Sequence, residues 1–214
     1  MFHIIFDNQI MYCEFDHVLN YTMEELIHYT DSWCEKLMDQ VRKNESLLAR
    51  LLIDKITNKY LQKSIVQLGF TKTIQGAPYF SRKPEMFLSI THSNGFVGVL
   101  LSTTPIGIDF EKIQKDNYQE LQIAFDKEDW DIVKNSSVEV FKYFSLKESF
   151  SKMIGTGFTT EPSSIKMNKL QKNSYVKFLE YNKQEYLISI ITENGCLSEV
   201  LDFSNDYLID IMNQ

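Results

Sequence analysis

Residues 87–111 read FLSITHSNGFVGVLLSTTPIGIDFE, a run of apolar and β-branched residues that turn formers interrupt twice. The interruptions are His92-Ser93-Asn94-Gly95 and Thr103-Thr104-Pro105. The stretches 87–91, 96–102 and 106–113 have the length and composition of β-strands. Because short turns join them, we predict an antiparallel meander of three strands at the centre of the chain.

The segment before the meander predicts a strand pair and two helices. Its first residues, MFHIIFDNQIMYCEF, lack the basic start of a signal peptide and favour two strands. Thr22 and Glu25 have the spacing of a capping box, which begins a helix. A second helix is expected after Asn44, where leucines recur at helical spacing. A short strand is expected at 70–74.

The segment after the meander has the same order, helices followed by strands. A helical region is expected at 118–134, and a helix beginning at a second capping box, Ser136 with Glu139, should end near Gly155. Strands are expected at 164–167, 175–181, 185–192, 196–203 and 207–212. The predicted fold class is therefore α+β, with helices packed on an antiparallel sheet in each of two halves, residues 1–104 and 105–214.

The composition is that of a globular protein and argues against several functions. Of the 214 residues, 43% are hydrophobic and 24% are charged, with a formal net charge of −7. Nucleic acids and anionic membranes recruit clustered Lys and Arg, so neither is an expected partner. Three cysteines without a CxxC pair favour free thiols in a reducing cytoplasm. No apolar run approaches the roughly 18 residues of a membrane span.

Two acidic residues, Asp109 and Glu111, stand near the end of the third expected strand. Alternate residues of a strand share a face, so both carboxylates should point one way while Ile108 and Phe110 point into a core. Adjacent carboxylates repel each other unless a cation lies between them, and Mg²⁺ prefers oxygen ligands. Taken alone, the pattern is more typical of a solvated strand face.

A second chemical pattern is FSLKESFSK at 144–152, which lies on an expected helix. Glu148 and Lys152 are four residues apart and so share one helix face. A carboxylate one turn from an ammonium suits a metal ligand or base beside a phosphate-binding lysine. Taken alone, the pair fits an ordinary surface ion pair, which contributes only about 0.3–0.5 kcal/mol.

The order of these motifs resembles the Sfp-type 4′-phosphopantetheinyl transferases. That family has a G-[IV]-D-[IV]-E strand followed by a W/F-[ST]-x-K-E-[SA]-x-x-K helix, which appear here at 107–111 and 144–152. Its [IL]-S-H-S segment appears as Ile90-Thr91-His92-Ser93, its G-K-P turn as Gly76-Ala77-Pro78 and its G-x-G as Gly155-Thr156-Gly157. The likeness covers residues 76–158, and the flanks share only the order of helices and strands.

The resemblance implies a fold and a reaction. In this family two similar α+β halves pack as a pseudo-dimer, and coenzyme A (CoA) binds in the cleft between them. A serine of an apo acyl or peptidyl carrier protein attacks the β-phosphate of CoA. The 4′-phosphopantetheine group is transferred and adenosine 3′,5′-bisphosphate leaves. The chain length is that of the family's single-chain pseudo-dimer, which implies a monomer.

The resemblance also implies roles for individual residues. Asp109, Glu111 and Glu148 would hold Mg²⁺, or Mn²⁺ in its place, against the CoA pyrophosphate. Glu148 would accept the serine proton and Lys152 would contact a phosphate, so these two are the predicted catalytic residues. The residues predicted to contact CoA are Ser46, Gly76, Pro78, Arg82, Lys83, Thr91, His92, Lys147 and Lys152.

Two positions depart from the family pattern. The turn lysine that helps to hold the 3′-phosphate of CoA is Ala77 here, and a family arginine corresponds loosely to Glu45. Each charged hydrogen bond contributes about 1.5–3 kcal/mol, so CoA should be held more weakly unless Arg82 and Lys83 substitute. Two alternatives stay open: a degenerate homologue that binds CoA or a carrier protein without transfer, and another Mg²⁺ enzyme such as a nucleotide pyrophosphohydrolase.

Overall fold

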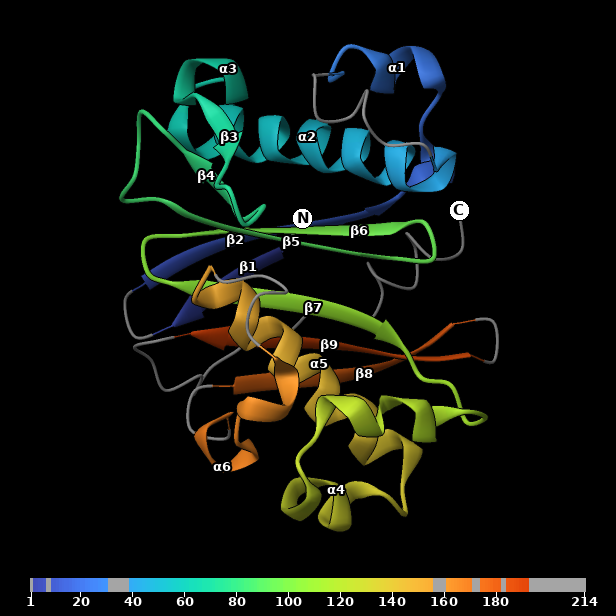
Figure 1. Cartoon of the computed structure of the whole chain (residues 1–214). Helices are drawn as coiled ribbons and strands as arrows, with labels where there is room; N and C mark the ends of the chain where they lie inside the picture. The colour runs from blue at the N-terminus through green and yellow to red at the C-terminus, as the bar shows by residue number, and fades with distance from the viewer. Residues whose placement is uncertain are drawn as a thin grey trace.

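The structure, a computed structural model, describes residues 2–6, 9–30, 39–155, 161–170, 174–181 and 184–192. Over these residues the chain is α+β, as predicted, with helices packed on antiparallel sheets (Figure 1). The strands expected at 196–203 and 207–212 lie outside the described residues, and so do Thr156 and Gly157.

The first sheet is built from residues that precede position 103. Its four strands are, in spatial order, β1 (Phe2–Phe6), β2 (Gln9–His17), β6 (Phe96–Ser102) and β5 (Phe87–Ser93). The short helix η1 (Val18–Asn20) follows β2. Helices α1 (Met23–Ile27), α2 (Gln40–Leu61) and α3 (Ile65–Leu68) lie together on one side of the sheet (Figure 1). A separate hairpin pairs β3 (Phe70–Lys72) with β4 (Pro78–Phe80).

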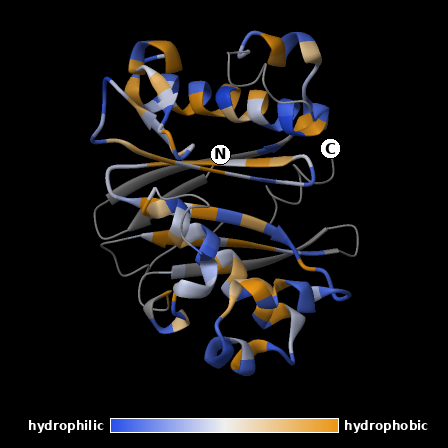
Figure 2. Cartoon of the chain, in the orientation of Figure 1, coloured by the Kyte–Doolittle hydropathy of each residue, from blue (hydrophilic) through white to orange (hydrophobic). Residues whose placement is uncertain are grey.

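The capping residues and the apolar stripe explain the helices of this half. The Thr22–Glu25 capping box begins α1, as predicted. Helix α2 begins at Gln40, five residues earlier than predicted, because the Asp39 side chain accepts a hydrogen bond from the Arg42 N–H and caps it. Four leucines of α2 are buried in one core cluster with Leu88 of β5 and with apolar residues of β6; these leucines are Leu47, Leu48, Leu51 and Leu52. Figure 2 shows α2 lying over this sheet, with hydrophobic residues in orange.

The second sheet begins at β7 (Ile106–Lys112), which pairs with β9 (Gln184–Thr192); β9 in turn pairs with β8 (Ser174–Tyr181). The predicted three-strand meander is therefore wrong: β5 and β6 form a hairpin, but β7 joins a different sheet. The segment between β6 and β7 explains why the chain leaves the first sheet and enters the second. The Thr104 N–H bonds to the Ser102 hydroxyl at 3.0 Å, and Pro105 has no N–H to continue a ladder.

Helix α5 (Ser137–Met153) packs on β7 and β9 (Figure 1). Further helices contact α5: η3 (Tyr118–Ala124), α4 (Lys127–Val133), η5 (Pro162–Ser164) and α6 (Met167–Leu170). The Ser136 hydroxyl caps α5 by accepting from the Glu139 N–H. The strand expected at 164–167 is wrong, because Pro162 begins a helical turn and the Asp129 carboxylate accepts the Met167 N–H at 3.1 Å. No helix of the described part of the chain has the length and apolarity to cross a membrane.

Side-chain hydroxyls and aromatic rings join the two sheets along β5 and β7. The Ser89 Oγ accepts a hydrogen bond from the Ile108 N–H at 3.1 Å, and the Thr91 Oγ1 accepts one from the Phe110 N–H at 2.9 Å. The ring of Phe96, on β6, also contacts the ring of Phe110, with centroids 5.7 Å apart. These contacts fix β7, which carries the acidic motif, beside the strand that carries Thr91 and His92.

Candidate functional site

The site begins with an unusually close approach between β7 and α5 at Gly107. A Cβ atom at this position would stand 1.7 Å from the backbone oxygen of Ser149 and 2.9 Å from the Met153 nitrogen. Only glycine permits this approach. The glycine of the strand motif therefore brings the second half of α5, with Glu148 and Lys152, against β7.

Asp109 lies at the centre of the contacts between β7, α5 and β5. Its side chain is buried, with 5% of its surface exposed. The Lys152 Nζ donates to Asp109 Oδ1 at 2.7 Å and to the Ile108 carbonyl at 3.0 Å. The Ser145 hydroxyl donates to Asp109 Oδ2 at 2.8 Å, and the Thr91 hydroxyl lies 3.3 Å from Oδ1. The strand motif and the helix motif thus meet in one buried ion pair.

Glu111 and Glu148 add negative charge beside this pair. Burial raises the pKa of Glu111 to about 8, with further contributions from the charges of Asp109 and Glu148, while Lys152 opposes the change. Burial, reinforced by Asp109, also raises the pKa of Glu148 above its ordinary value, again against the effect of Lys152. Three carboxyl groups, those of Asp109, Glu111 and Glu148, thus surround a single ammonium group, that of Lys152. One positive charge cannot balance all three of them when they are ionised.

The arrangement does not itself enclose a metal ion. Within the described residues, no three His, Cys, Asp or Glu side chains are grouped so that they could hold one as they lie. Asp109 instead directs its oxygens at Lys152 and Ser145. The donor chemistry nevertheless suits Mg²⁺, because all three candidates, Asp109, Glu111 and Glu148, carry carboxylate oxygens. Burial raises the pKa values of Glu111 and Glu148, and nearby carboxylate charge adds to this effect.

Thr91 and His92, two predicted CoA contacts, lie on β5 next to this group. Thr91 is 1% exposed, and its hydroxyl is engaged with the Phe110 N–H and Asp109. The His92 side chain is about half exposed and its Nδ1 lies 3.3 Å from Glu45 Oε2. Glu45 is buried and also accepts the Gly95 N–H at 2.9 Å. Burial alone would raise the pKa of Glu45, but the hydrogen bonds from His92 and Gly95 lower it below its ordinary value.

The predicted turn, Gly76-Ala77-Pro78, joins β3 to β4 and lies beside the end of α5. The Ala77 Cβ is 3.9 Å from the place where a Cβ of Gly155 would stand, just past Lys152. Gly76 has a φ of +89°, which explains the glycine at this turn. The structure therefore brings the turn to the helix that carries Lys152, although position 77 offers only a methyl group.

The two proposed substitute cations differ in their surroundings. Lys83 pairs with Glu85 at 2.9 Å. Arg82 follows β4, and its guanidinium lies 3.5 Å from the Gln67 carbonyl. Both remain predictions as CoA contacts. Ser46, on α2, accepts a hydrogen bond from Arg50 at 2.7 Å.

Lys147, another predicted CoA contact, points away from the carboxylates. It is fully buried, and its Nζ donates to the carbonyls of Ala124 at 3.1 Å and Pro162 at 3.2 Å. The same nitrogen lies 3.5 Å from Asp129 Oδ2 and 4.6 Å from the centre of the Phe125 ring. These contacts tie η3, α4 and η5 to α5, so the surroundings of Lys147 support a structural role.

Sequence reasoning missed two groups that shape the site. Ser189, on β9, bonds to both Ser145 and Ser149, and no motif includes it. The motif comparison indicates only that Glu45 stands where the family has an arginine, whereas the structure pairs its carboxylate with His92. Cross-strand register and helix packing create both contacts, and a single sequence shows neither.

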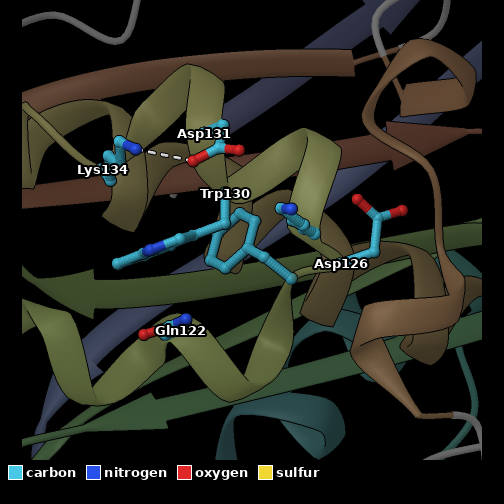
Figure 3. Close-up of a pocket in the computed structure, with 7 residues that line it drawn as sticks. Gln122, Asp126, Trp130, Asp131 and Lys134 are labelled. Atoms are coloured by element: carbon cyan, nitrogen blue, oxygen red, sulfur yellow. Dashed lines mark hydrogen bonds and ion pairs between the residues drawn. The ribbon is translucent and has the colours of Figure 1, made fainter.

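A pocket of about 440 Å³ lies elsewhere, on the surface of η3 and α4. Figure 3 shows Trp130 and Gln122 lining it, with Asp131 paired to Lys134 at its edge. Its complete lining is Gln122, Phe125, Asp126, Lys127, Trp130, Asp131 and Lys134. None of the acidic motif residues contributes to its lining, so this pocket is separate from the carboxylate group.

Comparison with known proteins shows the family of the chain. Residues 105–211, half of the chain, match the family model of the 4′-phosphopantetheinyl transferase superfamily. The chain belongs to this superfamily.

Two characterised relatives extend the likeness. The chain is 26% identical over 131 residues to 4′-phosphopantetheinyl transferase Sfp of Bacillus subtilis (strain 168). The aligned residues cover 59% of this chain and 58% of that protein. The chain is 28% identical over 145 residues to 4′-phosphopantetheinyl transferase gsp of Aneurinibacillus migulanus, covering 65% and 60%. The match thus spans 58–60% of the length of these two relatives.

Proposed function

We propose that the protein transfers the 4′-phosphopantetheine group of CoA to a serine of an apo acyl or peptidyl carrier protein. The serine oxygen bonds to the β-phosphorus of CoA, and the bond from that phosphorus to the bridging oxygen breaks. Adenosine 3′,5′-bisphosphate leaves with the bridging oxygen. The names of the relatives support this reaction class.

The observation that carries the proposal is the convergence of the two motifs on Asp109. Ser145 and Lys152 follow Asp109 by 36 and 43 positions in the sequence. Their side chains nevertheless donate to the Asp109 carboxylate at 2.8 Å and 2.7 Å. Glu148 and Glu111 interact electrostatically with the same carboxylate. A mere binding module would not require such a costly buried charge cluster.

A divalent metal, Mg²⁺ or Mn²⁺, would complete the group. Asp109, Glu111 and Glu148 would hold it, and when bound it supplies positive charge for the phosphoryl oxygens. Lys152, which donates to Asp109 Oδ1 and to the Ile108 carbonyl, would contact a phosphate of CoA with its remaining N–H.

The protein's own residues would supply the proton transfer. Glu148 would accept the proton of the attacking serine, and its raised pKa suits this role, because a base whose pKa lies closer to the working pH takes up a proton more readily. His92 would contact a CoA phosphate from near the end of β5. Thr91 would act through Asp109, since its hydroxyl already faces that carboxylate.

CoA would bind where the two sheets meet along β5 and β7, between an N-terminal half, 1–104, and a C-terminal half, 105–214. In this proposal the halves form the pseudo-dimer of the family, and one chain is sufficient for activity. The turn at Ala77 and the end of α5 would form one wall, as their proximity suggests.

A second candidate is a CoA- or carrier-binding homologue without transferase activity. The observation in its favour is that Ala77 offers no charge and Glu45 places a buried carboxylate on His92. A negative group beside that histidine reduces the net positive charge available to a phosphate.

The test is to incubate the protein with CoA, Mg²⁺ and a panel of apo carrier proteins and to record the intact mass of each carrier. The decisive variant is Glu148→Gln. Its matched control is Glu139→Gln on the same helix, where the side chain is exposed and pairs with Lys142. We expect a phosphopantetheine mass gain with the wild type and the control, and none with Glu148→Gln. CoA binding without a gain on any carrier would favour the second candidate.

A further inference from the structure

Three serine hydroxyls form a buried chain that ends on Asp109. Ser145 and Ser149 lie one turn apart on α5, and Ser189 is the cross-strand partner of Asp109 in the β7–β9 register. All three serines are 0% exposed. The Oγ–Oγ distances are 2.7 Å from Ser145 to Ser189 and 2.7 Å from Ser189 to Ser149.

The direction of the hydrogen bonds from Ser189 through Ser145 to Asp109 follows from counting protons. An ionised carboxylate only accepts, so Ser145 uses its single proton on Asp109 Oδ2, 2.8 Å away. The bond between Ser145 and Ser189 is therefore donated by Ser189. Ser149 Oγ lies 2.7 Å from Ser189 Oγ and donates to the Ser189 carbonyl at 3.0 Å. The hydroxyl dipoles of Ser189 and Ser145 consequently point toward the carboxylate.

A one-way chain of this kind has an electrostatic consequence. Aligned hydroxyls polarise one another, and each strengthens the next in a low-dielectric interior. The last bond, to Asp109 Oδ2, is charge-assisted and so is the strongest of the chain. It holds the carboxylate in one rotamer, with Oδ2 toward α5 and Oδ1 toward Lys152 and Thr91.

We propose that Ser189, acting through Ser145, is a positioning residue that fixes the orientation of Asp109 for cation binding. Ser189 lies outside both motifs, on β9. Its hydroxyl and that of Ser145 would keep Oδ2 of Asp109 in place when the carboxylate serves as a metal ligand. The inference rests on the proposed role of Asp109 as a metal ligand.

The test compares Ser189→Ala with a matched control, Ser102→Ala, in the full-length protein. Ser102 is likewise 0% exposed, but its hydroxyl lies 3.2 Å from that of Thr104, away from Asp109. Mn²⁺ affinity is measured by electron paramagnetic resonance without any carrier protein. We expect Ser189→Ala to weaken Mn²⁺ binding roughly tenfold or more, the usual effect of removing a group that orients a metal ligand. Ser102→Ala should leave the affinity unchanged, and equal effects of the two variants would overturn the proposal.

A second readout separates this inference from the proposed function. Melting temperatures are measured for Ser189→Ala, Asp109→Asn and the double variant. If the chain acts on the Asp109 charge, the loss caused by Ser189→Ala becomes smaller in the Asp109→Asn background. Strict additivity would refute the coupling between Ser189 and Asp109. A wild type that bound no Mn²⁺ would refute the proposed metal site and, with it, the role of Ser189 in cation binding, while the melting temperatures would still report on the coupling. Should Ser189→Ala fail to fold, Ser145→Ala takes its place in both measurements, with the same expectations.

Discussion

Replacing Gly107 by alanine should separate β7 from α5 and so dismantle the site. The new Cβ would stand 1.7 Å from the Ser149 backbone oxygen, whereas such contacts do not occur below 3.0 Å, so the gap must open by about 3.0 − 1.7 = 1.3 Å. Backbone meets backbone here, and no flexible side chain can give way. Glu148 precedes Ser149 directly and must move with it, while Asp109 stays with β7.

The expected losses follow from that displacement. Overpacking of a core costs about 1–3 kcal/mol, and a misplacement of about 1 Å at a reacting group costs about 10²-fold in rate. We would measure the free energy of unfolding in urea and the rate of carrier loading. For stability alone, Gly76→Ala is the comparison: no heavy atom lies within 4 Å of its Cβ, and its φ of +89° adds only a strain of about 1–2 kcal/mol. Wild-type stability and loading in Gly107→Ala would refute the reasoning.

Three further predictions concern buried charges. Because the pKa of Glu111 is raised to about 8 in the folded protein from its ordinary 4.5, the folded state binds the proton more tightly, so without metal the free energy of unfolding should fall as the pH rises from 4.5 through 8. Urea titrations in EDTA should show this decline, and Glu111→Gln should flatten it; an unchanged slope in the variant would contradict the assignment. Glu45→Ala should destabilise the protein by about 1–3 kcal/mol in urea, since the buried Gly95 N–H loses its acceptor, whereas Glu45→Gln, which keeps an acceptor, should lose less. Lys147→Met should cost about 3 kcal/mol because it leaves Asp129 without its buried partner, while Lys142→Met, at an exposed pair, should cost no more than about 1 kcal/mol. If Lys147 is structural, the Lys147→Met variant should keep nearly the wild-type Kd for CoA, measured by calorimetry, although its free energy of unfolding falls. A large change in the Kd with little change in stability would instead indicate that Lys147 contacts CoA.

Local signals predicted much of the fold. The capping box that begins α1 spans only the four residues from Thr22 to Glu25, and the strand 96–102 lies between two turns that are written in the sequence. Both features were therefore predictable from sequence. The pairing of β7 was not. A break such as Thr103–Pro105 suits a hairpin as well as a change of sheet, and only the partner β9, some eighty residues away, decides between them.

The candidate site was predictable where spacing alone fixes geometry. Glu148 and Lys152 share a helix face, and the structure brings Lys152 to Asp109. Lys147 shows the limit of reading a motif as a unit: neighbouring helix residues do not face the same way, so the lysine next to Glu148 enters a different core. Ser189 reaches Asp109 only through sheet register, which no local pattern reveals.

The most direct test of the transferase proposal is to measure both products of one reaction. CoA, Mg²⁺ and the protein are incubated with and without an apo carrier protein, and the carrier mass and the released adenosine 3′,5′-bisphosphate are quantified together. Transfer predicts one bisphosphate released for each phosphopantetheine gained by the carrier, and no release without carrier. Release without carrier would indicate hydrolysis of CoA, and neither product, with any carrier, would contradict the proposal.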